Sequence, residues 1–78
     1  MGTETQIEDG MRVKVTKLES TRGMMIAAQY LAARKKGATG TVQGYVPGHG
    51  GDVWWVRHDD GSVAAYCYTE LKGVTRGN

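Results

Sequence analysis

The stretch that decides the fold is VWWVRHDDGSVAAYC, residues 53–67. Two runs rich in β-branched and aromatic residues, 52–58 and 63–67, flank the polar tetrapeptide DDGS at 59–62. An Asp-Gly pair is typical of a type I′ turn, in which both central residues take positive φ angles. The pattern predicts an antiparallel hairpin whose two adjacent aspartates serve the turn rather than acid–base catalysis.

Three further strands are expected outside this hairpin. Residues 11–18 begin with six positions of strict apolar–polar alternation, the period of a half-buried strand. This alternation directs three apolar side chains inward: Met11, Val13 and Val15. A second strand is predicted over 40–46, and a fifth over 71–74 after a short turn. Several short strands separated by glycine-rich turns indicate a mainly β chain that forms a small barrel.

A helix is predicted over 24–36, within an insertion that spans about 21–36. Its apolar residues recur at the spacing of one helical face: Met24, Ala27, Ala28, Leu31 and Ala32. Ser20 and Thr21 are N-cap candidates, and Gly37 is a candidate for the residue after the last turn.

Composition excludes several classes of protein. A chain of 78 residues with a formal charge of +2 makes one small domain. No apolar run spans a bilayer, the first residues do not resemble a signal peptide, and one cysteine forms no internal disulfide. We expect a cytoplasmic domain over 10–73, with a disordered tail over 1–9 and a second tail over 74–78.

The residues resemble the SH3-like barrels of bacteria. The matching motifs are GxRVxV at 10–15, GxxGTV at 37–42, WVRxDDG at 55–61, Tyr66, and Glu70-Leu71. The second of these is similar to half of a KOW motif, which occurs in ribosomal and transcription-elongation proteins. The resemblance implies a five-stranded SH3-like barrel with one α-helix inserted after the first strand.

A narrower resemblance is to the plasmid-borne type II dihydrofolate reductases, which are tetramers around a central pore. Ser62, Val63 and Tyr66 match their pore strand. Ala64 and Ala65 stand where that family has the glutamine that contacts both ligands and the isoleucine that anchors the nicotinamide. This resemblance implies a homo-oligomeric enzyme as an alternative function.

The main candidate site combines aromatic and basic side chains. If Val56 faces the core, Trp55 and Arg57 point outward, and Tyr66 or Tyr68 lies beside them across the hairpin. Such a group stacks on nucleic-acid bases or grips a peptide. The competing interpretation is that both tryptophans are buried, one in the barrel and one beneath the helix.

A second candidate site is the basic end of the predicted helix. Arg34, Lys35 and Lys36 belong to a segment, 20–36, that carries four cations and no acid. Such a cluster attracts phosphate, although cations are also usual at a helix C-terminus.

The two histidines and the cysteine are not spaced to form one metal-binding or catalytic site. His49 lies in a glycine-rich loop, His58 ends a strand, and the spacing of Cys67 from either matches no metal-binding motif. We interpret His58 as an exposed side chain and Cys67 as a buried small thiol. The sequence predicts no catalytic residue, metal site or cofactor.

The predicted function is a small non-catalytic binding module for nucleic acid or a protein partner, with no membrane association. Two alternatives stay open: the oligomeric reductase-like enzyme, and an accessory subunit that docks through its helix.

Overall fold

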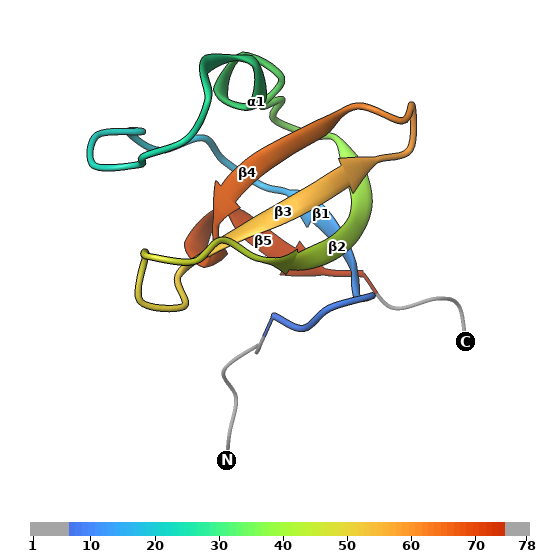
Figure 1. Ribbon diagram of the computed structural model, residues 1–78. Coiled ribbons are helices and arrows are strands. Elements are labelled where there is room, and N and C mark those ends of the chain that lie inside the picture. Colours follow the sequence, from blue (N-terminus) through green and yellow to red (C-terminus); the bar gives the residue numbers. More distant parts are fainter. Residues whose placement is uncertain (1–6, 75–78) are drawn as a thin grey trace.

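The computed structural model describes residues 7–74, which form five strands, one short α-helix and one 3₁₀ helix. The strands are β1 (Arg12–Val15), β2 (Thr39–Tyr45), β3 (Val53–His58), β4 (Val63–Cys67) and β5 (Leu71–Gly73). Helix α1 (Ala28–Ala32) lies between β1 and β2, and η1 (Tyr68–Glu70) joins β4 to β5 (Figure 1). The predictions of a mainly β chain, of five strands and of a helix after the first strand are confirmed. No helix in this part of the chain has the length and apolarity needed to cross a membrane.

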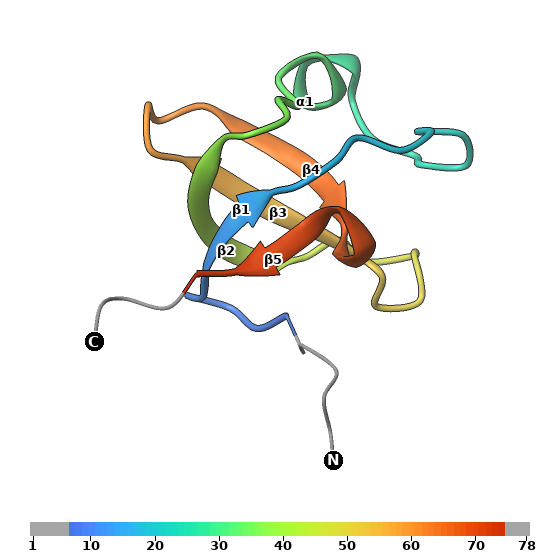
Figure 2. The same ribbon diagram turned by 180° about the vertical axis from the view of Figure 1, so that it is seen from behind.

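All five strands belong to one antiparallel sheet in the order β4-β3-β2-β1-β5. The sheet is strongly curled: β3 and β4 lie in front of β1 and β5 in Figure 1 and behind them in Figure 2. A register shift between Val42 and Gly44 interrupts the pairing of β2 with β3. Such a bulge bends a strand and increases its twist, which helps β2 to pass from one side of the core to the other.

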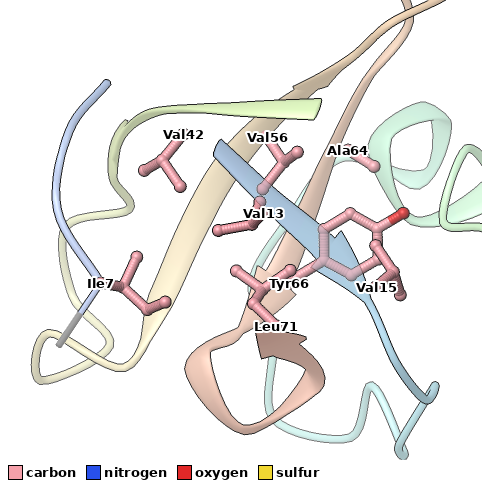
Figure 3. Packing of buried hydrophobic residues seen from close by; sticks show 8 residues of the cluster. All are labelled: Ile7, Val13, Val15, Val42, Val56, Ala64, Tyr66 and Leu71. Carbon is pink, nitrogen blue, oxygen red and sulfur yellow. The ribbon is translucent and has the colours of Figure 1, made fainter. Parts of the chain in front are cut away.

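The main core fills the concave side of this sheet (Figure 3). It contains Ile7, Val13, Val15, Val42, Val56, Ala64, Tyr66 and Leu71. The predicted inward residues of the first strand are confirmed, with Val13 and Val15 buried and Met11 packed against them.

The N-terminal segment takes part in this core. Ile7 is 9% exposed, and the Gly10 amide donates to the Val42 carbonyl at 2.7 Å. The predicted tail over 1–9 therefore does not extend to Ile7, because burial of this one apolar side chain favours order. The rest of that prediction, residues 1–6, lies outside the described residues, as do residues 75–78 of the second predicted tail.

A smaller apolar cluster lies on the opposite face of β3 and β4. Val46, Val53 and Ala65 are buried there. Met24, Ile26 and Trp55 pack against them and are partly buried. The segment between β1 and β2, residues 16–38, is called the connection below, and it provides the cover for this face.

The predicted helix over 24–36 is wrong in extent, since α1 spans only residues 28–32. Tertiary hydrogen bonds replace helical ones at both ends. The Met25 amide donates to the ring of His49, and the Lys35 amide donates to the Tyr66 hydroxyl. The N-cap residue is Ala27 rather than Ser20 or Thr21. The three basic residues at 34–36 consequently lie beyond the last turn, so a basic helix end is not formed.

The hairpin between β3 and β4 is confirmed, but its turn is not of type I′. The Gly61 amide donates to the His58 carbonyl at 2.9 Å, and the His58 amide donates to the Ser62 carbonyl at 2.7 Å. Gly61 has a positive φ of 94°, whereas no non-glycine residue among residues 7–74 has a positive φ. The arrangement is that of a type I turn followed by a left-handed glycine. The Asp60 carboxylate stabilises it by accepting bonds from the Ser62 amide and hydroxyl.

Candidate functional site

Trp55 and Arg57 lie on the outer face of β3, opposite the buried Val56. Arg57 is exposed, whereas Trp55 is half-buried and meets Tyr30 edge to face with 5.0 Å between ring centroids. Trp54 packs against the main core, and its indole N–H donates to the Gly51 carbonyl. Each tryptophan is thus partly buried, one against the core and one beneath the connection, which is close to the competing interpretation of the sequence.

The two predicted tyrosines do not join this surface. Tyr66 pairs with Trp54 across the hairpin and therefore faces inward, where it is 0% exposed. Tyr66 is therefore not presented to an external ligand in this structure, because the strand register turns its side chain into the core. Tyr68 is exposed in η1, where its amide bonds to the Asp52 carbonyl, just before the start of β3. Arg57 lies toward the other end of the same strand.

Arg34 is a structural residue rather than a surface cation. Its guanidinium forms an ion pair with Glu70, and the two side chains are 4% and 0% exposed. The same guanidinium donates to the main-chain carbonyls of Ala65 and Glu19 at 2.9 and 3.1 Å. The Arg34 guanidinium is therefore not presented to a nucleic-acid phosphate in this structure, because its charge is compensated inside the fold.

Lys35 and Lys36 are exposed, as a nucleic-acid contact requires. They line an open cleft of about 490 Å³ between the connection and the turn of the β3–β4 hairpin. Asp59 and Asp60 line the same cleft. Two lysines and two aspartates therefore share the cleft, which weakens its attraction for phosphate.

A directed hydrogen-bond network runs from this cleft into the core. The Tyr66 hydroxyl accepts the Lys35 amide at 2.8 Å and bonds to His58 Nε2 at 2.7 Å. His58 Nδ1 contacts the Ser62 hydroxyl at 2.8 Å, and that hydroxyl donates to Asp60. His58 is 6% exposed, so the expectation of an exposed histidine is wrong.

This network limits what its groups can do chemically. The Ser62 hydroxyl donates its hydrogen bond to Asp60, so its oxygen accepts the hydrogen bond from His58 Nδ1–H. His58 therefore does not act as a general base for the Ser62 hydroxyl. Burial raises the pKa of the Tyr66 hydroxyl, and the bonds from Ser62 lower the pKa of the Asp60 carboxyl. The Ser62–His58 pair therefore serves the turn and the core rather than nucleophilic attack.

The strand register assembles a group of cations on the outer face of the sheet. Arg12 pairs with Thr41, and Thr41 pairs with Arg57, so these three side chains form one row across β1, β2 and β3. In the next row, Lys72 pairs with Lys14, which pairs with Thr39. All four cations are exposed. We call Arg12, Lys14, Arg57 and Lys72 the basic face.

One acid lies within the basic face. Asp59 is salt-bridged to Arg12 at 2.7 Å and accepts a bond from the Thr39 hydroxyl at 2.6 Å. The Arg12 guanidinium holds the pKa of the Asp59 carboxyl well below its usual range. This pairing orients Arg12 and leaves an excess of three positive charges over Lys14, Arg57 and Lys72.

Of the four cations of the basic face, Arg57 alone was among the site residues predicted from the sequence. The alternation of residues 11–15 implies that Arg12 and Lys14 point away from the core, so that signal was available. Their position beside Arg57 depends on the pairing of β1 and β3 with β2, which brings together residues about 45 positions apart.

No protein-family model, curated protein or solved structure matches this chain. Across residues 7–74, no group of three or more His, Cys, Asp or Glu side chains is placed to hold a metal ion.

Proposed function

We propose that this protein is a small non-catalytic binding module that holds nucleic acid against the basic face. One observation carries the proposal: the register places four exposed cations on neighbouring strands, and within residues 7–74 Asp59 is the one acid salt-bridged to them. Directly opposed residues in antiparallel strands lie about 5 Å apart, so the rows give a continuous positive surface. Phosphate backbones bind such surfaces with little dependence on base sequence.

The neutral groups of this surface support the same partner. Thr41 lies between Arg12 and Arg57 and offers a hydroxyl group that bonds to phosphate oxygens. Trp55 lies two residues from Arg57 on the same side of β3, and its partly exposed ring is available for stacking on a base. The cleft at Lys35 and Lys36 lacks this charge excess.

The proposal includes an SH3-like barrel as the fold. Support comes from the strand order, in which β1 pairs with both β2 and the last strand, and from the bulge that bends β2. The free thiol of Cys67 fits the reducing cytoplasm. The reductase-like alternative receives less support, because Tyr66 of the proposed pore strand bonds to His58 and Lys35 inside one chain. For the helix-docking alternative, Leu18 and Met25 are exposed large apolar side chains in the connection.

The salt dependence of binding tests this proposal. We expect a fluorescent single-stranded oligonucleotide to bind the full chain with an affinity that falls as salt rises from 50 to 200 mM. Each phosphate contact contributes about 0.7 to the slope of log affinity against log salt. The double variant Lys14→Gln/Arg57→Gln should therefore lower the slope by about 1.4, because it removes two contacts.

The double variant Lys35→Gln/Lys36→Gln is the matched control, since it removes the same charge outside the basic face. It should retain most of the slope. Equal losses in the two variants would show a response to net charge alone and would contradict the proposed face. No measurable binding at 50 mM salt would remove nucleic acid as the partner.

A further inference from the structure

A second open cavity, of about 360 Å³, overlaps the basic face at Arg57. Its volume lies within the range of small-molecule pockets, about 300–1,000 Å³. Residues of β2, the end of β3 and the following turn line it: Thr41, Gln43, Arg57, His58, Asp59 and Gly61. We call this cavity the polar pocket, because its exposed side chains all carry polar groups.

Arg57 and Gln43 contribute the hydrogen-bond donors of the polar pocket. Both side chains are exposed, and Arg57 forms none of the salt bridges found within residues 7–74. The guanidinium carries five N–H donors in a planar fork, whereas an amide carries both donors and an acceptor. The pocket therefore offers a bidentate donor beside a group that bonds in either direction.

Asp59 contributes an acceptor whose orientation is fixed. Arg12 donates to its Oδ1 at 2.7 Å and to its Oδ2 at 3.0 Å, and the Thr39 hydroxyl also donates to Oδ2. A carboxylate oxygen has two acceptor positions, so Oδ1 keeps one for a ligand. The side chain is 54% exposed. Because Arg12 keeps the pKa of this carboxyl low, the group is ionised and only accepts.

This combination of groups fits a nucleobase better than a phosphate. The donors of Arg57 bond to acceptors, whereas the Asp59 carboxylate bonds to donors and repels a second anion. The two residues are two positions apart, which is about 7 Å along an extended chain. The matching ligand is therefore neutral and presents acceptors along one edge and donors along the next. An unpaired base has this form.

Guanine is the base that presents two adjacent acceptors and, beside them, two adjacent donors. Its O6 and N7 atoms are those that an arginine binds through both arms of its fork. Its N1–H and N2–H₂ groups lie along the neighbouring edge and suit a carboxylate oxygen and an amide oxygen. Adenine has an amino group beside N7, so it would place a donor against Arg57. Cytosine and thymine each offer one donor group.

We propose that the polar pocket holds one unpaired guanine of a single strand that lies on the basic face. Arg57 donates to O6 and N7, while Asp59 Oδ1 and the Gln43 carbonyl accept from N1–H and N2–H₂. Two of the five N–H donors of Arg57 serve the base, and the others remain for a phosphate. Because N1–H and N2–H₂ belong to the Watson–Crick edge, a guanine paired in a duplex does not fit. The inference rests on the proposed function, since the basic face holds the strand.

Base substitution in the ligand tests the pocket with the unsubstituted protein. A short fluorescent oligothymidylate carries thymine, adenine, cytosine or guanine at its central position, and the affinity of each strand for the full chain is measured at low salt. The strand with guanine should bind about tenfold more tightly than the others, within the range of one bidentate base contact. The analogue 7-deazaguanine lacks the N7 acceptor, and hypoxanthine lacks the N2 amino group. Each should lose most of the gain.

The outcomes separate the polar pocket from the proposed function. Equal affinity for the four strands, with the salt dependence retained, overturns the guanine pocket and leaves the basic face in place. Tighter binding of another base, or full affinity for the 7-deazaguanine strand, also overturns it. No measurable binding of any strand removes the proposed function, and the pocket proposal with it. Equally strong binding of free guanosine monophosphate would show a mononucleotide site and contradict a strand in the pocket.

The variant Asp59→Asn gives an independent readout, because its two effects have opposite directions. Removal of a negative charge from the basic face should raise the affinity for oligothymidylate. Loss of the carboxylate should at the same time lower the preference for guanine to about threefold or less. A purely electrostatic role of Asp59 would raise the affinity for both strands by the same factor and would contradict the proposal.

The variant Asp60→Asn is the matched control. Asp60 carries the same charge in the same turn, but the polar pocket is lined by Asp59 and not by Asp60. This variant should keep the preference for guanine. Equal preferences in the two folded variants would refute the contact with Asp59. If Asp59→Asn does not fold, the base analogues with the unsubstituted chain decide the matter.

Discussion

At the residue scale, the carboxylate of Glu70 accepts hydrogen bonds from two residues distant in sequence, Arg34 and Glu19, and from the nearby Cys67. Arg34 donates to both oxygens, and the amides of Cys67 and Glu19 donate to one oxygen each. A buried carboxylate without such partners would be strongly destabilising. Glu70 therefore joins the connection to the end of β4, and its position depends on all of these donors together.

This pair predicts strong coupling between two substitutions. Glu70→Leu or Arg34→Met alone should lower the free energy of unfolding by about 3–5 kcal/mol, because each leaves a buried charge unpaired. The double variant should lose much less than the sum of the two single losses. Because such losses approach the whole stability of the domain, urea unfolding of the four proteins is measured in the presence of the stabilising osmolyte TMAO. Additive losses would mean that the two charges do not compensate each other.

At the scale of elements, β2 and β3 approach each other closely at Gly40. A Cβ atom added at this position would overlap the carbonyl oxygen of Arg57 and lie 2.9 Å from the Cα of His58. The obstacle is main chain and cannot move aside as a flexible side chain would. Glycine is thus required here for close approach of two strands, not for an unusual φ angle.

Gly40→Ala should consequently destabilise the protein by about 2–3 kcal/mol, within the usual range for overpacking. Gly23→Ala is the control, because Gly23 has a positive φ of 87° but nothing within 4 Å of an added Cβ. That variant should lose about 1 kcal/mol through backbone strain alone. Thermal and urea unfolding compare the two, and a larger loss for Gly23→Ala would refute the steric argument.

At the scale of the whole molecule, segments outside the sheet complete the burial of its two faces. Ile7 adds to the main core from the N-terminal side, and the connection covers the smaller cluster around Trp55. A domain of this size has a net stability of only about 3–5 kcal/mol from its core. The apolar burial by each such segment is therefore a substantial part of the net stability of the fold.

Ile7→Ala tests whether this segment belongs to the fold. It should lower the free energy of unfolding by about 2 kcal/mol, the lower end for truncating a buried isoleucine. Leu18→Ala provides the control, since Leu18 is 45% exposed and its loss should cost no more than about 0.5 kcal/mol. If both variants lose equally little free energy of unfolding, Ile7 belongs to a tail outside the folded core.

The local pattern of the sequence was sufficient to predict the elements. Alternation placed Val13 and Val15 inward, and the polar DDGS tetrapeptide placed the hairpin. These features depend on neighbours within a few positions, where strand period and turn chemistry act directly. The same pattern predicted the outward direction of Arg57 but not the residues that would lie beside it.

Only the tertiary structure decided the helix length and the composition of the candidate site. The helix is short because the Met25 and Lys35 amides bond to His49 and Tyr66 instead of to helical carbonyls. Arg34 points inward and pairs with Glu70. Arg12 lies across Thr41 from Arg57 because strands far apart in sequence pair in one register. Such contacts form between residues that no local period relates, so the chain must fold before they exist.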